Sequence, residues 1–178
     1  MGSSPVVDDL PHGLRVGERT YVVTRAAAAD VAAVVALLRD DELGAAREPA
    51  TADDLAPYRR AFEQIDADPN QLLVVVRRQD EVVATLQLTF LRTLSRQGAL
   101  RMQVEAVRVA GPERGAGLGR ALLGWAVEAG RARGAVLAQL TTDRRRVAAH
   151  RFYARLGWVD THRGMKLDLT RAAGPAVS

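Results

Sequence analysis

Hydrophobic residues change their spacing along the chain, and these changes predict a succession of strands and helices. Alternation over residues 20–25 predicts a first strand. Apolar residues then recur at helical spacing over 31–38, where Asp30 is suited to cap the helix start. A second helix is predicted from about 51 to 65, with Asp54 in its first turn. The first part of the chain therefore predicts a strand followed by two helices.

In the middle of the chain, the hydrophobic residues have the spacing that is typical of strands. A continuous β-branched run over 72–76 predicts a buried strand, and 82–91 alternates well enough to be its hairpin partner. Residues 100–109 predict a long strand in which the alternation slips at Ala106 and Val107. Such a slip is typical of a β-bulge, where one strand carries an extra residue.

Helices and strands alternate in the last part of the chain. The predicted elements are a helix over 117–132, a strand over 135–140, a helix over 144–156 that Gly157 ends, and strands over 158–161 and 165–169. No repeat, linker or second domain is indicated. We therefore predict a flexible N-terminal arm over 1–18, a single domain over 19–170 and a C-terminal tail over 171–178.

Composition narrows the class of protein. Of the 178 residues, 48% are hydrophobic and 26% are charged, which is the balance of one globular domain. No apolar run approaches the roughly 20 residues of a membrane helix, and the N-terminus lacks the pattern of a secretory signal. The absence of cysteine excludes disulfides, thiolate metal sites and cysteine nucleophiles. We expect a cytoplasmic protein that has no membrane partner.

Charge is distributed unevenly. The net charge is +4, and Lys166 is the only lysine. Residues 1–70 carry 13 acids against 7 arginines, whereas residues 71–178 carry 18 basic residues against 8 acids. A basic half suits either nucleic acid or a phosphorylated cofactor, but the few aromatic residues are not interleaved with the arginines, which disfavours nucleic acid. The three histidines are scattered, so no metal is expected.

A glycine-rich loop lies between the strand that ends at 109 and the helix predicted from 117. A helix start presents unpaired backbone N–H groups and the positive end of the helix dipole. Glycines at 115, 117 and 119 remove the Cβ atoms that would keep a phosphate from those groups. Arg114 and Arg120 flank the loop with positive charge. The segment therefore predicts a binding site for a diphosphate.

Several kinds of phosphate site use glycines, and the neighbouring residues separate them. A dinucleotide-binding fingerprint needs a further glycine within 121–123 and an acid after the next strand, where Thr141 and Thr142 stand. A P-loop needs a Gly-Lys-Ser/Thr ending, which this loop lacks. A turn with a purely structural purpose remains an alternative.

Two motifs follow one another in this part of the chain. The first has the form (Gln or Arg)-x-x-Gly-x-(Gly or Ala), and it is matched by Arg114, Gly117 and Gly119. The second has the form Ala-x-x-(aliphatic or aromatic)-Tyr-x-x-x-Gly-(Phe or Trp), and it is matched by Ala149, Phe152, Tyr153, Gly157 and Trp158. With both motifs, residues 103–169 resemble the acetyl-CoA-binding half of the GNAT N-acetyltransferases.

The resemblance implies a fold and a cosubstrate. The GNAT fold is an α/β (α+β) fold whose central twisted sheet is mixed, mostly antiparallel, and built of six to seven strands with about four flanking helices. The cosubstrate would be acetyl-CoA, with no metal. Backbone groups of Val107 and Val109 would pair with its pantetheine. Its diphosphate would be held by the backbone of Arg114, Gly115, Ala116, Gly117, Leu118, Gly119 and Arg120.

The resemblance also implies two catalytic residues. Tyr153 would protonate the departing CoA thiolate, for which a phenol of pKa about 10 is suited. Its helical spacing alone would favour simple packing beside Phe152. Glu105 precedes the first cofactor contact and would remove a proton from the attacking amine. Its alternative role is that of an exposed strand carboxylate paired with an arginine such as Arg101.

One position departs from the family pattern. Many members carry Asn three residues before the motif alanine, where this chain has Arg146. A subgroup similar to aminoalkylphosphonate acetyltransferases has a basic residue there and an Ala-His-Arg-Phe-Tyr sequence like residues 149–153. The favoured interpretation of the arginines over 144–146 is a solvated helix start. Because they oppose the dipole of the helix that they begin, an anionic neighbour such as the 3′-phosphate of the cofactor or an anionic substrate is the alternative.

The acceptor is the least specified partner. The region 38–70, which borders the acceptor pocket in this family, is acidic and would attract a cationic amine. The leading interpretation is an N-acetyltransferase acting on a small-molecule amine. The alternatives are a protein or peptide N-acetyltransferase and a non-catalytic acyl-CoA-binding regulatory module. Homodimers are frequent in the family, so a homodimer is compatible with the resemblance.

Overall fold

The computed structural model describes residues 10–40, 42–45, 48 and 55–170. These fall into two compact units, one ending at Leu140 and the other beginning at Thr141. Within the described ranges, none of the helices combines the length and the hydrophobicity that crossing a bilayer requires.

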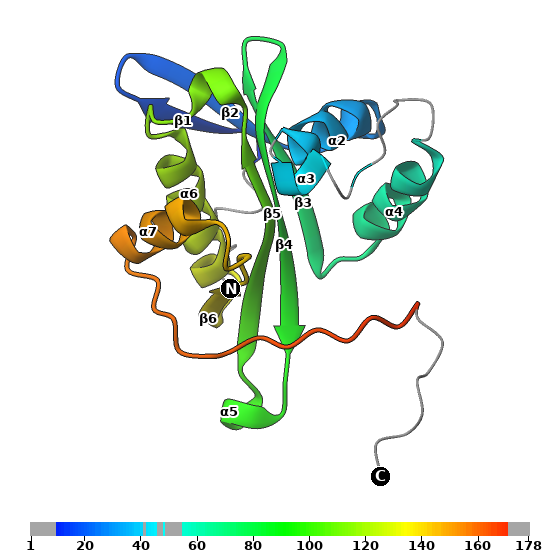
Figure 1. Ribbon diagram of the computed structural model, residues 1–178, viewed down its shortest axis with the longest axis vertical. Helices are drawn as coiled ribbons and strands as arrows, with labels where there is room; N and C mark the ends of the chain where they lie inside the picture. The colour runs from blue at the N-terminus through cyan, green and yellow to red at the C-terminus, as the bar shows by residue number, and fades with distance from the viewer. Residues whose placement is uncertain (1–9, 41, 46–47, 49–54, 171–178) are drawn as a thin grey trace, which may run out of the picture. The chain divides into compact units, whose positions relative to one another are not determined.

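The first unit is built on a sheet whose six strands lie side by side in the order of the chain (Figure 1). Every neighbouring pair is antiparallel except the last, which is parallel. The sheet confirms the predicted α/β fold class with a mixed, mostly antiparallel sheet. Its strands are β1 (His12–Val16), β2 (Arg19–Arg25), β3 (Gln71–Arg78), β4 (Glu81–Arg92), β5 (Leu100–Val109) and β6 (Ala135–Leu140).

Helices cover both faces of this sheet. Helices α2 (Val31–Arg39) and α4 (Ala56–Ala67) pack on one face with Leu73 and Val75, and α6 (Leu118–Ala132) packs on the other (Figure 1). The run over 72–76 is buried throughout, as predicted for a strand covered on both sides. The remaining short elements of this unit are η1 (Ala28–Asp30), α3 (Glu42–Ala45), α5 (Ser95–Gly98) and η3 (Gly111–Glu113).

The prediction of a loose arm over 1–18 was wrong for its last part. Residues 12–16 form β1, and a two-residue turn connects them to β2 in a hairpin, with Gly17 at a φ of +59°. Leu14 is buried, but this single inward-facing residue gives too short an alternation to predict a strand. The division of the whole chain into arm, domain and tail stays a prediction.

The predicted helix starts also needed correction. Helix α4 begins at Ala56 instead of about 51, and Asp54 lies outside the described residues. Asp30 directly precedes α2, but its side chain does not cap that helix. Its carboxylate instead accepts a hydrogen bond from the Ala27 N–H, at 2.9 Å, and binds Arg77 on β3. Asp30 therefore pairs with a cation that lies far along the chain, and it does not cap the helix that follows it.

The second unit contains one helix, α7 (Val147–Arg155), within its described residues. It is shorter than the predicted helix over 144–156. Gly157 follows it with a φ of +84°, which confirms its predicted place at the helix end. The strands predicted over 158–161 and 165–169 were wrong, because the structure assigns no strand there. Alternation sorts side chains onto two faces, but it does not supply the backbone partner that makes a strand.

The predicted bulge is present between β4 and β5. Gln87 is opposite Glu105 and Thr85 is opposite Arg108, so Leu86 faces two residues of β5. Ala106, the first of these two, has a left-handed backbone with a φ of +52°. The slip in the sequence pattern therefore marks an extra residue in the strand.

Substitutions at Ala106 should reveal this backbone conformation. We expect Ala106→Val to lower the free energy of unfolding by about 1–2 kcal/mol, because a β-branched side chain is strained at positive φ. The free energy of unfolding of Ala106→Gly should stay within about 1 kcal/mol of the wild-type value, since glycine adopts this conformation without strain. Urea denaturation followed by circular dichroism measures both. An Ala106→Val protein as stable as the wild type would contradict the bulge geometry.

Candidate functional site

The glycine loop runs along the surface directly into helix α6. Gly115 and Gly117 have φ values of +78° and +99°, and residues 114–117 are exposed. Leu118, the first helical residue, is completely buried and anchors the helix to the sheet. A Cβ on Gly115 would meet no atom within 4 Å. The first backbone N–H groups of α6 therefore lie beside an open surface that a phosphate can approach.

Glu113 holds the base of this loop. It is only 4% exposed and accepts hydrogen bonds from the Tyr21 hydroxyl at 2.6 Å, Arg19 at 2.9 Å and Arg78 at 2.8 Å. The hydrogen bond from Tyr21 holds the pKa of Glu113 below its ordinary value, against the effect of burial and with the help of the two arginines. Burial raises the pKa of Tyr21. The loop is thus fixed to β2 and β3, a role that sequence reasoning missed.

Arg114 supports the loop with its side chain. Its Nε donates to the Val109 carbonyl at 2.9 Å, and its Nη2 donates to the carboxylate and to the carbonyl of Asp40, both at 2.7 Å. The same carboxylate accepts the Gly111 N–H. The guanidinium therefore joins the end of β5 to the end of α2, whereas Arg120 is exposed at the helix start.

The end of β5 extends beyond its neighbour β6. Their last paired residues are Val104 and Leu140, and β5 continues to Val109. Arginine side chains donate to two carbonyls of this extension, Arg108 to Val107 and Arg114 to Val109, each at 2.9 Å. A strand end that extends past its partner strand suits pairing with an extended, amide-containing chain. The predicted residues Val107 and Val109 lie on this extension.

Glu105 belongs to a row of residues that crosses three strands. Leu73 is opposite Gln87, and Gln87 is opposite Glu105. Directly opposed residues share a face of the sheet, so Glu105 lies on the face that α2 and α4 cover. Its side chain is exposed. The structure thus places Glu105 immediately before the bulge and on the helix-covered face.

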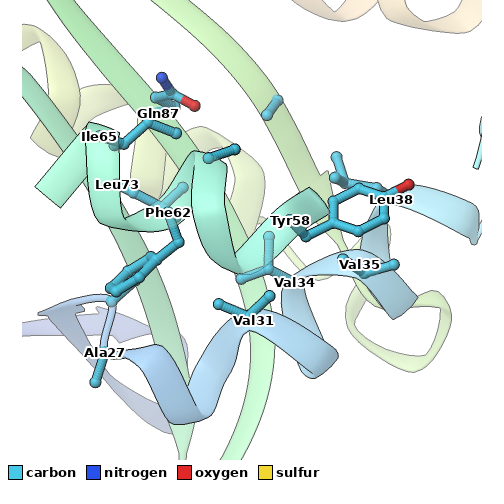
Figure 2. Close-up of a pocket in the computed structure, with 13 residues that line it drawn as sticks. Ala27, Val31, Val34, Val35, Leu38, Tyr58, Phe62, Ile65, Leu73 and Gln87 are labelled. Carbon is cyan, nitrogen blue, oxygen red and sulfur yellow. The ribbon is translucent and has the colours of Figure 1, made fainter. Parts of the chain in front are cut away.

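A cavity of about 110 Å³ lies on this same face between α2 and α4 (Figure 2). Its walls are apolar side chains of both helices, including Val31, Val34 and Phe62. Gln87 and Ala106 line it from the sheet. The family resemblance implied an acceptor pocket beside residues 38–70, but sequence reasoning missed the apolar lining of this cavity, because its residues have the pattern of ordinary core positions in separate elements.

The acidic residues predicted to attract an amine are partly paired. Asp40 is bound by Arg114, and Glu48 accepts a hydrogen bond from the hydroxyl of Tyr58, which lines the cavity. Asp41, Asp53 and Asp54 lie outside the described residues, and the side chain of Glu42 is likewise not described. Of the acids over 38–70 that were predicted to attract the amine and are described, Glu48 is bound to a residue that lines the cavity.

Tyr153 lies on α7 in the second unit. Its ring is 5.4 Å from that of Phe152 and 6.2 Å from that of Trp158, measured between centroids. Before the helix, Asp143 accepts two hydrogen bonds from the guanidinium of Arg145, which raises the pKa of Arg145. Asp143 is thus an anionic neighbour of the arginine run within the protein.

Removing the charge of Glu113 should destabilise the first unit in a pH-dependent way. We expect Glu113→Gln to lower the free energy of unfolding by about 2 kcal/mol at pH 7, because three donors lose a buried carboxylate. The pKa of Glu113 is lower in the folded state, so its stabilising effect is complete above its unfolded pKa of about 4.3 and is lost as the pH falls below that.

Urea titrations of wild type and variant at several pH values measure this difference. The difference in the free energy of unfolding between wild type and Glu113→Gln should shrink as the pH is lowered from 5 toward 3. Glu128→Gln serves as the control, since Glu128 forms an exposed pair with Arg131 and should change stability by less than about 0.5 kcal/mol. A gap of equal size at every pH would contradict the assigned role of Glu113.

The fold, the glycine loop and the strand extension together define the class of protein. The chain matches the Acetyltransferase (GNAT) family over residues 32–158, and it belongs to that family. It is an enzyme, an N-acetyltransferase. Within the part of the chain that the structure describes, no three metal-ligating side chains are grouped as a metal site would require.

Individual relatives have different functions. An aminoalkylphosphonate N-acetyltransferase of Salmonella typhimurium is 34% identical over 109 residues, which are 61% of this chain and 70% of the relative. A transcriptional regulator from Bacillus halodurans is 39% identical with a TM-score of 0.80, and the match covers 84% of this chain and 99% of the regulator's chain. Glucosamine-6-phosphate N-acetyltransferase from Arabidopsis thaliana shares the fold at 17% identity, with a TM-score of 0.67. The match covers 85% of this chain and 99% of the plant enzyme.

Proposed function

We propose that the protein transfers an acetyl group from acetyl-CoA to the primary amine of a small molecule, by direct attack of the amine on the thioester. The observation that carries this proposal is the exposed glycine loop at the start of α6, next to the extension of β5. An anionic diphosphate is suited to the helix start. An amide-containing pantetheine is suited to the strand edge. The two features are adjacent, as the two parts of one coenzyme require.

The proposed binding groups follow from this placement. The diphosphate binds the backbone from Arg114 to Arg120, and the pantetheine pairs with Val107 and Val109. Gly115 leaves open space where another residue would carry a Cβ. The side chain of Arg114 keeps its contacts to Asp40 and Val109, and it supports the loop from within the protein.

In the proposed reaction the amine nitrogen forms a bond to the thioester carbonyl carbon, and the carbon–sulfur bond breaks. The ammonium group first loses one proton, which Glu105 accepts directly or through water, and the nitrogen loses its second proton to solvent as the amide forms. The departing CoA thiolate gains one proton, which Tyr153 donates. Glu105 is suited to its role by its exposed side chain beside the bulge. The role of Tyr153 rests on the second motif.

Two measurements test the proposed function. Calorimetry with acetyl-CoA should show binding at one site per chain, and a thiol-release assay should show CoA formation that depends on a primary amine. The panel should contain alkylamines, polyamines, an aminoalkylphosphonate, amino acids and N-terminal peptides. Acetylation of peptides but not of free amines would favour a protein N-acetyltransferase. Absence of both binding and turnover would refute the proposal.

A second candidate is a regulatory role that depends on binding of acyl-CoA. It is favoured by the 39% identical structure of a transcriptional regulator. Binding of acetyl-CoA without transfer to any amine would support it. Cytoplasmic location and a homodimeric state remain predictions, which fractionation and analytical ultracentrifugation would test.

Substituting Tyr153 separates its catalytic role from packing. We expect Tyr153→Phe to lower kcat about tenfold or more while the affinity for acetyl-CoA stays unchanged, because the variant keeps the ring but loses the proton donor. Phe152→Leu is the control, since it changes a neighbouring ring without removing a hydroxyl. An unchanged kcat in Tyr153→Phe would show that the residue only packs.

A further inference from the structure

The cavity between α2 and α4 has a chemical character that bears on the acceptor. Among the described residues that line it, none has a positively charged side chain. The polar groups that reach it have partners within the protein: the Tyr58 hydroxyl donates to Glu48, and the Gln87 amide donates to Gln71 at 2.8 Å. A charged group entering the cavity would lose its hydration without gaining a counter-ion. An apolar group would gain by leaving water.

The cavity is also connected to the proposed reaction centre. Ala106 lines it and is the left-handed residue of the bulge, and Gln87 lines it and is directly opposite Glu105. Cross-strand partners have Cβ atoms about 5 Å apart. An amine held next to Glu105 would therefore have its carbon substituent within reach of the apolar walls.

The volume limits the size of the occupant. The cavity measures about 110 Å³, and an engineered apolar cavity of about 150 Å³ is known to bind benzene. A branched aliphatic chain of about four or five carbons fits this space. A single methyl group would leave most of it unfilled.

From the proposed function and this placement, we infer that the preferred acceptor is a primary amine with an apolar substituent of about four or five carbons, which fills the cavity between α2 and α4. The substituent lies against Val31, Val34 and Phe62, and the amino group lies beside Glu105. The specificity of the enzyme is thus set by burial of hydrocarbon, and an anionic phosphonate substituent is disfavoured.

A homologous series of amines tests the inference with the full-length protein and saturating acetyl-CoA. From methylamine through propylamine to 3-methylbutylamine, kcat/KM should rise about fourfold for each added carbon. 2-Aminoethylphosphonate and 1,4-diaminobutane should be poorer than 3-methylbutylamine by about 100-fold or more. A flat series, or a preference for the phosphonate or the diamine, would overturn the inference.

A cavity-filling variant gives an independent readout. Ala61 lines the mouth of the cavity on α4, and Ala67 lies on the same helix outside it. Ala61→Leu should reduce the preference for 3-methylbutylamine over methylamine, measured as the ratio of their kcat/KM values, about tenfold. Ala67→Leu should leave the preference unchanged. Equal preferences in wild type and Ala61→Leu would also overturn the inference.

The outcomes separate this inference from the proposed function. Acetylation of amines without dependence on the apolar substituent overturns the inference and leaves the proposed function intact. Failure to bind acetyl-CoA, or to acetylate any amine, overturns both.

Discussion

Replacing Glu105 by glutamine is expected to lower kcat/KM for amine acetylation about 10²- to 10⁴-fold at neutral pH. Glutamine keeps the size of the side chain but cannot accept the proton that the attacking nitrogen must lose. Glu105 is exposed at the bulge of β5, and it lies on the sheet face that carries the cavity. The loss should therefore appear in the chemical step, while the affinity for acetyl-CoA stays unchanged.

The pH dependence distinguishes a lost base from a distorted site. An alkylammonium group has a pKa of about 10.4, so most of the amine is protonated at pH 7 and must be deprotonated before attack. The loss of kcat/KM in Glu105→Gln relative to the wild type should therefore become smaller as the pH is raised from 7 toward 10. Glu128→Gln on α6 is the control and should retain full activity. An equal deficit at every pH would contradict the assignment of Glu105 as the base.

Replacing Ala116 by aspartate is expected to weaken acetyl-CoA binding about 100-fold or more. Ala116 is exposed in the middle of the glycine loop, and its backbone is not left-handed, so a side chain can be added there without strain. A carboxylate about 6 Å from a phosphate charge costs about 3 kcal/mol at an effective dielectric constant of 20. Calorimetry measures the affinity directly.

The matched control is Ala116→Asn, which adds a side chain of the same shape without the charge. Its affinity for acetyl-CoA should fall by less than about tenfold. Raising the salt concentration should partly restore binding to Ala116→Asp, because repulsion between exposed charges is screened. Equal affinities in Ala116→Asp and Ala116→Asn would show that the diphosphate binds elsewhere.

Local patterns predicted several parts of the fold correctly. The slip at Ala106 and Val107 predicted the bulge, because the alternation of a strand is visible in consecutive residues. Hydrophobic spacing predicted the helix over 117–132, and its inward residues Leu118, Leu122, Trp125 and Ala129 are buried. Both features depend on spacings of a few residues, which a sequence displays directly.

Tertiary structure reassigned residues whose partners are far away in the chain. Asp30 was predicted to cap α2, but Arg77, 47 residues later, binds its carboxylate. Arg114 was predicted to add charge to the phosphate loop, and its guanidinium binds Asp40, 74 residues earlier. A local pattern indicates what a side chain can do, whereas the fold decides which of several partners comes within hydrogen-bonding distance.

The amino-acid sequence alone determined the glycine loop and its position at the start of a helix, because both are properties of a few adjacent residues. Only the tertiary structure revealed that Glu113 fixes that loop, since its partners Tyr21 and Arg19 are 92 and 94 residues away. The same holds for the apolar cavity, whose walls come from α2, α4 and three strands. Spatial proximity between such distant segments arises from packing and is not encoded in the spacing of residues within any one of them.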